Sequence, residues 1–156
     1  MKLFLTDEAG APNPACRLEK STVRSGDEVG PAAFDAGASA ASEVWLASDS
    51  AVCVEIGYVE VRSALAAAAR AKRLSPAQFK EAKRLFEDIW SQLDVVQIDE
   101  SLVRAAADLA ESDGLRGYDA VHLAAALRVD VDAFAAADTA LIRAAEKHKL
   151  HVAELN

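Results

Sequence analysis

The chain has 156 residues and a mass of 16.5 kDa, a size typical of one compact domain. Apolar residues make up 52% of the sequence and charged residues 27%, the balance of a folded protein with a core. The 17 basic and 25 acidic residues give a net charge of −8, which argues against a broad basic surface that binds nucleic acid by counterion release. A nucleic-acid substrate is not excluded, because a metal ion bound in a cleft can reverse the local field.

The cysteines and the first residues indicate a cellular compartment. Cys16 and Cys53 have neither CxxC spacing nor nearby histidine pairs, so we predict no disulfide framework and no zinc site. The apolar run at residues 1–5 is too short for a signal peptide or a membrane span. We therefore expect a soluble cytoplasmic protein that makes no membrane contact.

The N-terminal part of the chain contains one recognisable element. The apolar residues 2–5 predict a short buried strand. Residues 6–42 hold three of the four prolines and four of the seven glycines, with no sustained apolar period. We expect this segment to be irregular, with one short helix at about residues 38–46.

From residue 51 onward, apolar runs and helical periods alternate along the chain. The expected strands are 51–56, 94–99, 131–136 and 150–154, and the expected helices are 59–72, 76–93, 100–112, 118–128 and 139–148. Ser75 followed by Pro76 is typical of a helix start. This alternation predicts an α/β fold with a parallel sheet covered on both faces, in which ligands bind at the carboxyl ends of the strands.

Three acidic residues lie among apolar neighbours, each at a predicted strand-to-helix junction or helix start. They are Glu60 in Tyr58-Val59-Glu60-Val61-Arg62, Asp119 in Gly117-Tyr118-Asp119-Ala120-Val121-His122-Leu123, and Asp138 in Ala136-Ala137-Asp138-Thr139. Burying an ionised carboxylate costs several kcal/mol unless it is paired or bound to a cation. Mg²⁺ and Mn²⁺ prefer oxygen ligands and can activate water for phosphodiester hydrolysis. The three acids together therefore predict one metal site.

Each acid also has a structural interpretation. Asp119 can complement a helix macrodipole, a role worth roughly 0.3–1 kcal/mol. Glu60 can be a surface residue paired with a base on the next helical turn, and Asp138 can be the N-cap of the last helix.

The histidines and tryptophans have plain interpretations as well. His122 shares a helix face with Asp119 and could serve as a ligand or base, although a packed or hydrogen-bonded histidine is the simpler expectation. We expect His148 and His151 to be solvated. Trp45 and Trp90 are most simply core or interface aromatics.

Taken together, these acidic segments resemble PIN-domain ribonucleases, most closely the VapC-like toxins of bacterial toxin–antitoxin pairs. The resemblance covers about residues 43–156, with the segments around Glu60, Asp119 and Asp138 in family order and near family spacing. It implies a PIN-like three-layer α/β/α domain with a mainly parallel central sheet, spanning residues 1–156. It also implies that these acids coordinate Mg²⁺ or Mn²⁺ and cleave RNA, and that the protein forms a homodimer and binds a VapB-like antitoxin.

The chain departs from the family pattern at its front. Relatives usually begin with a strand that ends in an aspartate, whereas here the strand at residues 2–5 is followed by Thr6 and then Asp7. Asp7 is the nearest candidate for the fourth acid, but a shift of one residue turns an extended side chain to the other face. Glu19 and Asp27 are weaker substitutes. Residues 6–42 are then an insertion, a frame-altered stretch or a degenerate copy, and the sequence does not choose among these.

The leading hypothesis is a Mg²⁺/Mn²⁺-dependent endoribonuclease, the toxin of a type II pair, with Glu60, Asp119 and Asp138 as catalytic metal ligands and Asp7 as a fourth. The alternative is a catalytically degenerate PIN-fold protein that binds an antitoxin-like partner without cleaving RNA, since losing one carboxylate weakens metal binding. A nuclease that is not a toxin is a third possibility.

Overall fold

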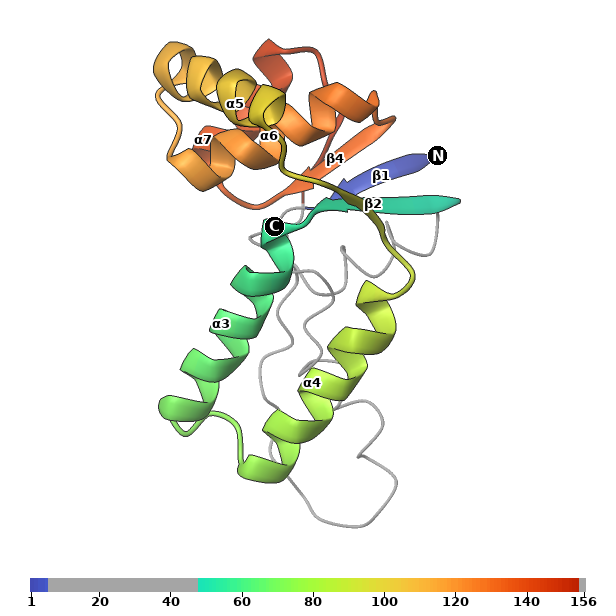
Figure 1. The fold of residues 1–156 in the computed structure, drawn as a ribbon, viewed down its shortest axis with the longest axis vertical. Coiled ribbons are helices and arrows are strands. Elements are labelled where there is room, and N and C mark those ends of the chain that lie inside the picture. Colours follow the sequence, from blue (N-terminus) through green and yellow to red (C-terminus); the bar gives the residue numbers. More distant parts are fainter. Residues whose placement is uncertain (6–47, 155–156) are drawn as a thin grey trace.

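The computed structural model describes residues 1–5 and 48–154, and these form an α/β/α sandwich (Figure 1). Its parallel sheet has the strand order β3-β2-β1-β4-β5. The strands are β1 (Lys2–Leu5), β2 (Ser50–Val54), β3 (Asp94–Val96), β4 (Ala133–Ala136) and β5 (Val152–Glu154). The helices of the described part are α3 (Ile56–Arg70), α4 (Pro76–Trp90), α5 (Glu100–Asp113), α6 (Gly117–Val129) and α7 (Thr139–Lys147).

The predicted fold class and each predicted element within the described residues are confirmed. Several bounds differ by two or three residues. Strand β3 ends at Val96 rather than at residue 99, and α4 ends at Trp90 rather than at residue 93. Strand β2 stops at Val54 rather than at residue 56, so that α3 begins three residues earlier than predicted. The Glu55 N–H donates to the Val96 carbonyl and the Glu55 carbonyl then accepts from the Tyr58 N–H, which turns the chain into the helix. Ile56 extends the apolar run in sequence but belongs to α3. The predicted helix at 38–46, Cys16 and Trp45 lie outside the described residues.

The central strand β1 is packed by small and aromatic side chains. Leu3 and Phe4 are fully buried, and the Phe4 ring stacks on Phe134 of β4 with centroids 5.6 Å apart. Helix α6 lies against this sheet and buries a row of small residues, namely Ala120, Ala124, Ala125 and Ala126. Small side chains let a helix approach a sheet closely, which brings the start of α6 near the carboxyl ends of the strands.

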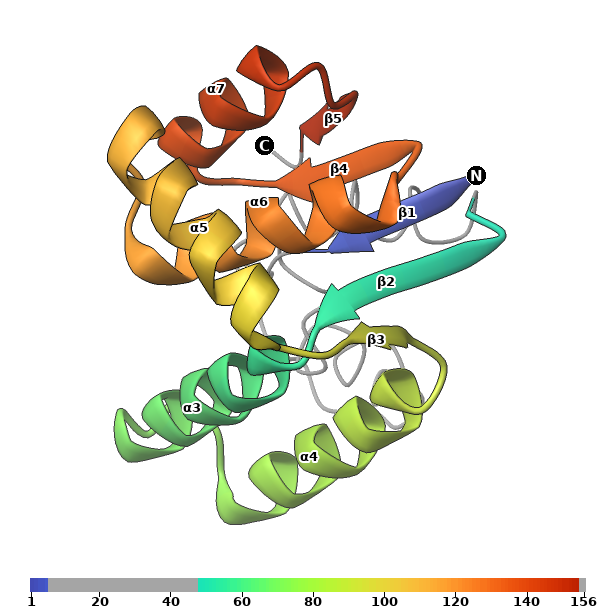
Figure 2. The same ribbon diagram turned by 45° about the horizontal axis from the view of Figure 1, so that its top comes forward.

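The chain adds strands to the sheet in two directions from β1. Strands β2 and β3 lie on one side of β1, and the chain then crosses to place β4 and β5 on the other side (Figure 2). The strand order therefore reverses between β1 and β4. In open parallel sheets, ligands bind at the carboxyl ends of the strands beside such a reversal.

Helices α3 and α4 form an antiparallel pair on the other side of the sheet from α5, α6 and α7 (Figure 1). They share a small apolar cluster around Leu65 and Phe86. The predicted start of α4 is confirmed, because Ser75 and Gln78 form a capping box ahead of Pro76. None of the helices in residues 48–154 is long and apolar enough to cross a membrane.

Candidate active site

The start of α6 positions two charged residues of opposite sign. Gly114 adopts a left-handed conformation (φ +67°) that ends α5, and the chain then turns into α6 with Arg116 at its N-cap. Asp119 lies in the first helical turn and is 6% exposed. Its Oδ2 accepts from Arg116 Nε at 2.7 Å, and Oδ1 lies 3.5 Å from Arg116 Nη2. Asp119 therefore has both the helix-start position of its structural interpretation and a cationic partner.

Asp138 lies at the N-cap of α7, directly after β4. Its Oδ1 accepts from the backbone N–H groups of Ala140 and Leu141, each at 2.9 Å, which confirms the predicted N-cap. Its Oδ2 lies 3.7 Å from Arg116 Nη2. One carboxylate oxygen is thus fixed by the helix, while the other faces the same guanidinium that binds Asp119.

Glu60 lies in the second turn of α3 and contacts α6. Its Oε2 is 2.9 Å from Nε2 of His122, and its side chain is 16% exposed. The expected surface pair with a base on the next turn is therefore wrong. The expectation of a packed, hydrogen-bonded His122 is confirmed, since this side chain is fully buried. The contact joins residues that are 62 positions apart in sequence.

A glycine allows α3 to lie close enough for this contact. A Cβ at Gly57 would lie 2.6 Å from Cys53 Sγ and 3.9 Å from His122 Cε1. Real Cβ atoms do not approach that closely, so the first turn of α3 packs directly onto β2 and beside His122. The absence of a side chain at this position is compatible with the close packing of α3, from which Glu60 reaches His122.

The structure brings two of the predicted acids onto one cation. Asp119 and Asp138 both face Arg116, whereas Glu60 faces His122, which lies one turn beyond Asp119 on α6. Within residues 1–5 and 48–154, no group of three or more His, Cys, Asp or Glu side chains is arranged to hold a metal ion. Asp7, Glu19 and Asp27 lie outside the described residues, so the four-acid site remains a prediction. The donor chemistry fits Mg²⁺ or Mn²⁺, because Asp119 and Asp138 offer carboxylate oxygens on either side of a bound positive charge.

The position of β1 bears on the missing acid. Leu5, its last residue, pairs with Ala135 of β4, and the strand also pairs with β2. The carboxyl end of β1 therefore lies between the strand that leads to Glu60 and the strand that leads to Asp138. An acid held beside this end of β1 would lie between Glu60 and Asp138.

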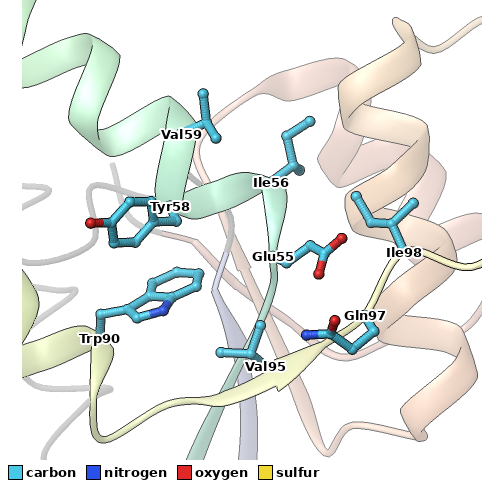
Figure 3. Close-up of a pocket in the computed structure, with 8 residues that line it drawn as sticks. All are labelled: Glu55, Ile56, Tyr58, Val59, Trp90, Val95, Gln97 and Ile98. Carbon is cyan, nitrogen blue, oxygen red and sulfur yellow. The ribbon is translucent and has the colours of Figure 1, made fainter.

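A separate hollow of about 620 Å³ lies between α3, α4 and β3 (Figure 3). It is lined by Glu55, Ile56, Tyr58, Val59, Trp90, Val95, Gln97 and Ile98. The Tyr58 and Trp90 rings meet edge to face in it, with centroids 5.3 Å apart. Trp90 is partly buried against the cluster around Leu65 and Phe86, which agrees with the prediction of a core or interface aromatic. None of the three predicted acids lines this hollow, so we place the candidate active site at Arg116, Asp119 and Asp138 instead.

Sequence reasoning missed Arg116 and misjudged His148. Arg116 is detectable in principle, because a base three residues before an acid at a helix start is a favourable pair. His148 was expected to be solvated, but its Nε2 lies 2.7 Å from Oδ2 of Asp113, the last residue of α5. His151 is exposed, as expected.

Comparison with known proteins identifies the family. A model of the PIN domain matches residues 32–147, which include Glu60, Arg116, Asp119 and Asp138. The chain belongs to the PIN-domain family. The predicted resemblance is confirmed, and the PIN-domain match leaves out β1 even though this strand lies at the centre of the sheet.

Two relatives from Mycobacterium tuberculosis refine this placement. Ribonuclease VapC45 of strain CDC 1551 / Oshkosh and Ribonuclease VapC49 of strain ATCC 25618 / H37Rv are each 38% identical to the chain over 117 residues. Each alignment covers 75% of this chain and 76% of the relative. The protein is thus a VapC-like PIN domain.

Proposed function

We propose that this protein is a Mg²⁺- or Mn²⁺-dependent endoribonuclease and the toxin of a VapBC-type pair. The observation that carries the proposal is the convergence of Asp119 and Asp138 on one cation at the strand reversal between β1 and β4. The names of its two ribonuclease relatives support RNA as the substrate. We further propose that it acts in the cytoplasm as a homodimer and is held inactive by a VapB-like antitoxin.

The chain's own residues supply a rigid set of oxygen ligands. Asp119 is buried at the start of α6, and Asp138 is fixed through Oδ1 by two backbone N–H groups of α7. These two acids would hold the metal ion, with Glu60 and an N-terminal acid such as Asp7 completing the site. When bound, such an ion offsets the charge that develops on a phosphodiester attacked by water. The backbone bonds to Asp138 keep its other oxygen in place for that purpose without reorganisation.

A second candidate function is partner binding without RNA cleavage. The observation that favours it is the Glu60–His122 contact, which turns the Glu60 carboxylate to a histidine on α6. A PIN fold that lacks one or two metal ligands would bind metal weakly and still present its surface to an antitoxin-like partner.

Cleavage of labelled single-stranded RNA with Mg²⁺, Mn²⁺ or EDTA tests the proposal, with Asp138→Asn as the variant. Asparagine caps a helix as well as aspartate does, so this change removes a metal ligand while keeping the α7 cap. Asp99→Asn is the matched control, because Asp99 also caps a helix, α5, and also pairs with an arginine, Arg128. We expect metal-dependent cleavage by the unchanged protein and by Asp99→Asn, and its loss in Asp138→Asn. No cleavage by the folded, unchanged protein would favour partner binding instead.

A further inference from the structure

We propose that Arg116 is an internal cation that holds Asp119 and Asp138 together in the metal-free protein, and that a divalent metal ion must displace it to bind. The inference rests on the proposed function, because it concerns the same pair of acids. It adds that metal binding here is an exchange of one cation for another.

Arg116 contacts both acids. Its Nε lies 2.7 Å from Asp119 Oδ2, while Nη2 lies 3.5 Å from Asp119 Oδ1 and 3.7 Å from Asp138 Oδ2. The guanidinium therefore faces two carboxylates that belong to different helices. A metal ion that binds both carboxylates has to take the same space.

The charges of Arg116, Asp119 and Asp138 do not balance. Two carboxylates close together repel each other and need a counter-ion, and one guanidinium leaves the group with a net negative charge. A divalent ion brings twice the charge of arginine to the same oxygens. The attraction between the two carboxylates and a divalent ion therefore favours the exchange of arginine for metal. Because the arginine contacts must be broken first, the measured affinity for the metal is lower by their energy.

The exposure of the side chains decides which group moves. The Arg116 side chain is 67% exposed, whereas that of Asp119 is 8% exposed. Asp138 is held by its two backbone bonds at the start of α7. Arg116 is therefore the group that can turn toward solvent when a metal ion arrives, while both acids stay in place.

Isothermal titration of Mn²⁺ into purified full-length protein tests the exchange, with Arg116→Gln as the variant. The matched control is Arg128→Gln, which also breaks an arginine–aspartate pair at a helix start, that of Arg128 with Asp99. Residues 119 and 128 are nine positions apart on α6, which corresponds to about 13 Å of helix. We expect Arg116→Gln to bind Mn²⁺ roughly 2- to 10-fold more tightly than the unchanged protein, and Arg128→Gln to bind it with unchanged affinity.

Thermal unfolding provides a second readout that does not depend on activity. Without metal, Arg116→Gln should melt below the unchanged protein, because two carboxylates lose their counter-ion, and Mn²⁺ should raise its melting temperature by the larger amount. Arg116→Lys keeps the positive charge but lacks the planar guanidinium that contacts both acids at once. We therefore expect its Mn²⁺ affinity to lie between those of the unchanged protein and Arg116→Gln. This variant carries the test if Arg116→Gln does not fold.

The outcomes separate this inference from the proposed function. Equal or weaker Mn²⁺ binding by Arg116→Gln, with clear binding by the unchanged protein, overturns the exchange and leaves the metal site standing. No Mn²⁺ binding by either protein overturns both the exchange and the proposed metal dependence.

Discussion

Two clusters of acids and bases in this protein differ in their charge balance. At the candidate active site, Asp119 and Asp138 face one guanidinium, that of Arg116. At the ends of α5 and α7 the ratio is reversed, because the single carboxylate of Asp113 accepts from both Lys147 and His148. Counted over residues 1–5 and 48–154, acids exceed bases in the first cluster, and bases exceed acids in the second.

This difference separates a site that can take up a cation from one that is complete. The Asp113 side chain is 2% exposed and joins the last residue of α5 to the last turn of α7. Its partners hold the pKa of Asp113 below the ordinary value, Lys147 most strongly and His148 next. Two bases of the fold therefore compensate its charge. Among the side chains that the structure describes, the Asp119 cluster still has negative charge to offset, and this is the electrostatic character expected of a metal site.

The largest expected effect comes from replacing one aspartate of each cluster by asparagine and comparing the two variants. Asp119→Asn should reduce RNA cleavage roughly 100-fold or more, because it removes a proposed metal ligand. Its thermal midpoint should stay nearly unchanged, since the loss of the Arg116 ion pair is offset by less repulsion with Asp138. Asp113→Asn should lower the thermal midpoint, because Lys147 and His148 lose their carboxylate, and should leave the rate of RNA cleavage unchanged. Cleavage rates and thermal midpoints of both variants, measured side by side, give the answer. If both variants lose stability and keep activity, the two clusters are alike and the comparison fails.

Glu60 belongs to neither cluster in this structure, and Gly57 offers a way to test where it acts. Gly57→Ala would place a methyl group against Cys53 Sγ, and the overpacking should cost roughly 1–3 kcal/mol. The resulting shift of α3 would also move Glu60 away from His122. If Glu60 serves the metal site, the variant loses Mn²⁺ affinity as well as stability.

The double variant Gly57→Ala/Cys53→Ala is the control for this prediction. Removing the sulfur makes room for the new methyl group, so stability and Mn²⁺ affinity should both recover in part. Chemical denaturation and Mn²⁺ titration measure the two quantities. A single variant that is destabilised with unchanged Mn²⁺ affinity would assign Glu60 a purely structural role.

Much of the fold was predictable because the signals are local. Apolar runs identified β1, β2 and β4, and the Ser75-Pro76 pair identified the start of α4. The N-cap role of Asp138 was likewise predictable from its neighbours alone. The end of β2 was predicted too late because Ile56 continues the apolar run, whereas the chain turns into α3 at Glu55, whose carbonyl accepts from the Tyr58 N–H.

The pairings within the candidate site were less predictable because most are not local. Glu60 meets His122 across 62 positions, where the first turn of α3 packs closely at Gly57. His148 meets Asp113 across 35 positions, and hydrophilic neighbours in sequence concealed the contact. The three acids themselves were found from sequence because acids among apolar residues stand out locally. Which partner each acid has depends on how the helices pack.

The smallest expected effect is a pH dependence that belongs to the Asp113 cluster. The pKa of Asp113 in the folded protein lies below its ordinary value of 3.8, because Lys147 and His148 stabilise the carboxylate. In the unfolded chain, Asp113 takes up its proton first as the pH falls. The stabilisation is therefore fully present above about pH 4 and is lost as the pH falls through the folded pKa.

The free energies of unfolding of the unchanged protein and of Asp113→Asn should therefore differ most at neutral pH. The two values should converge as the pH falls below about 4. Chemical denaturation at a series of pH values measures this difference directly. Asp99→Asn provides a comparison, since Arg128 holds the pKa of Asp99 well below its usual range and a similar convergence should appear there. A difference for Asp113→Asn that stays constant with pH would mean that its two bases act by packing and not by charge. The contrast with the Asp119 cluster would then lose its electrostatic basis.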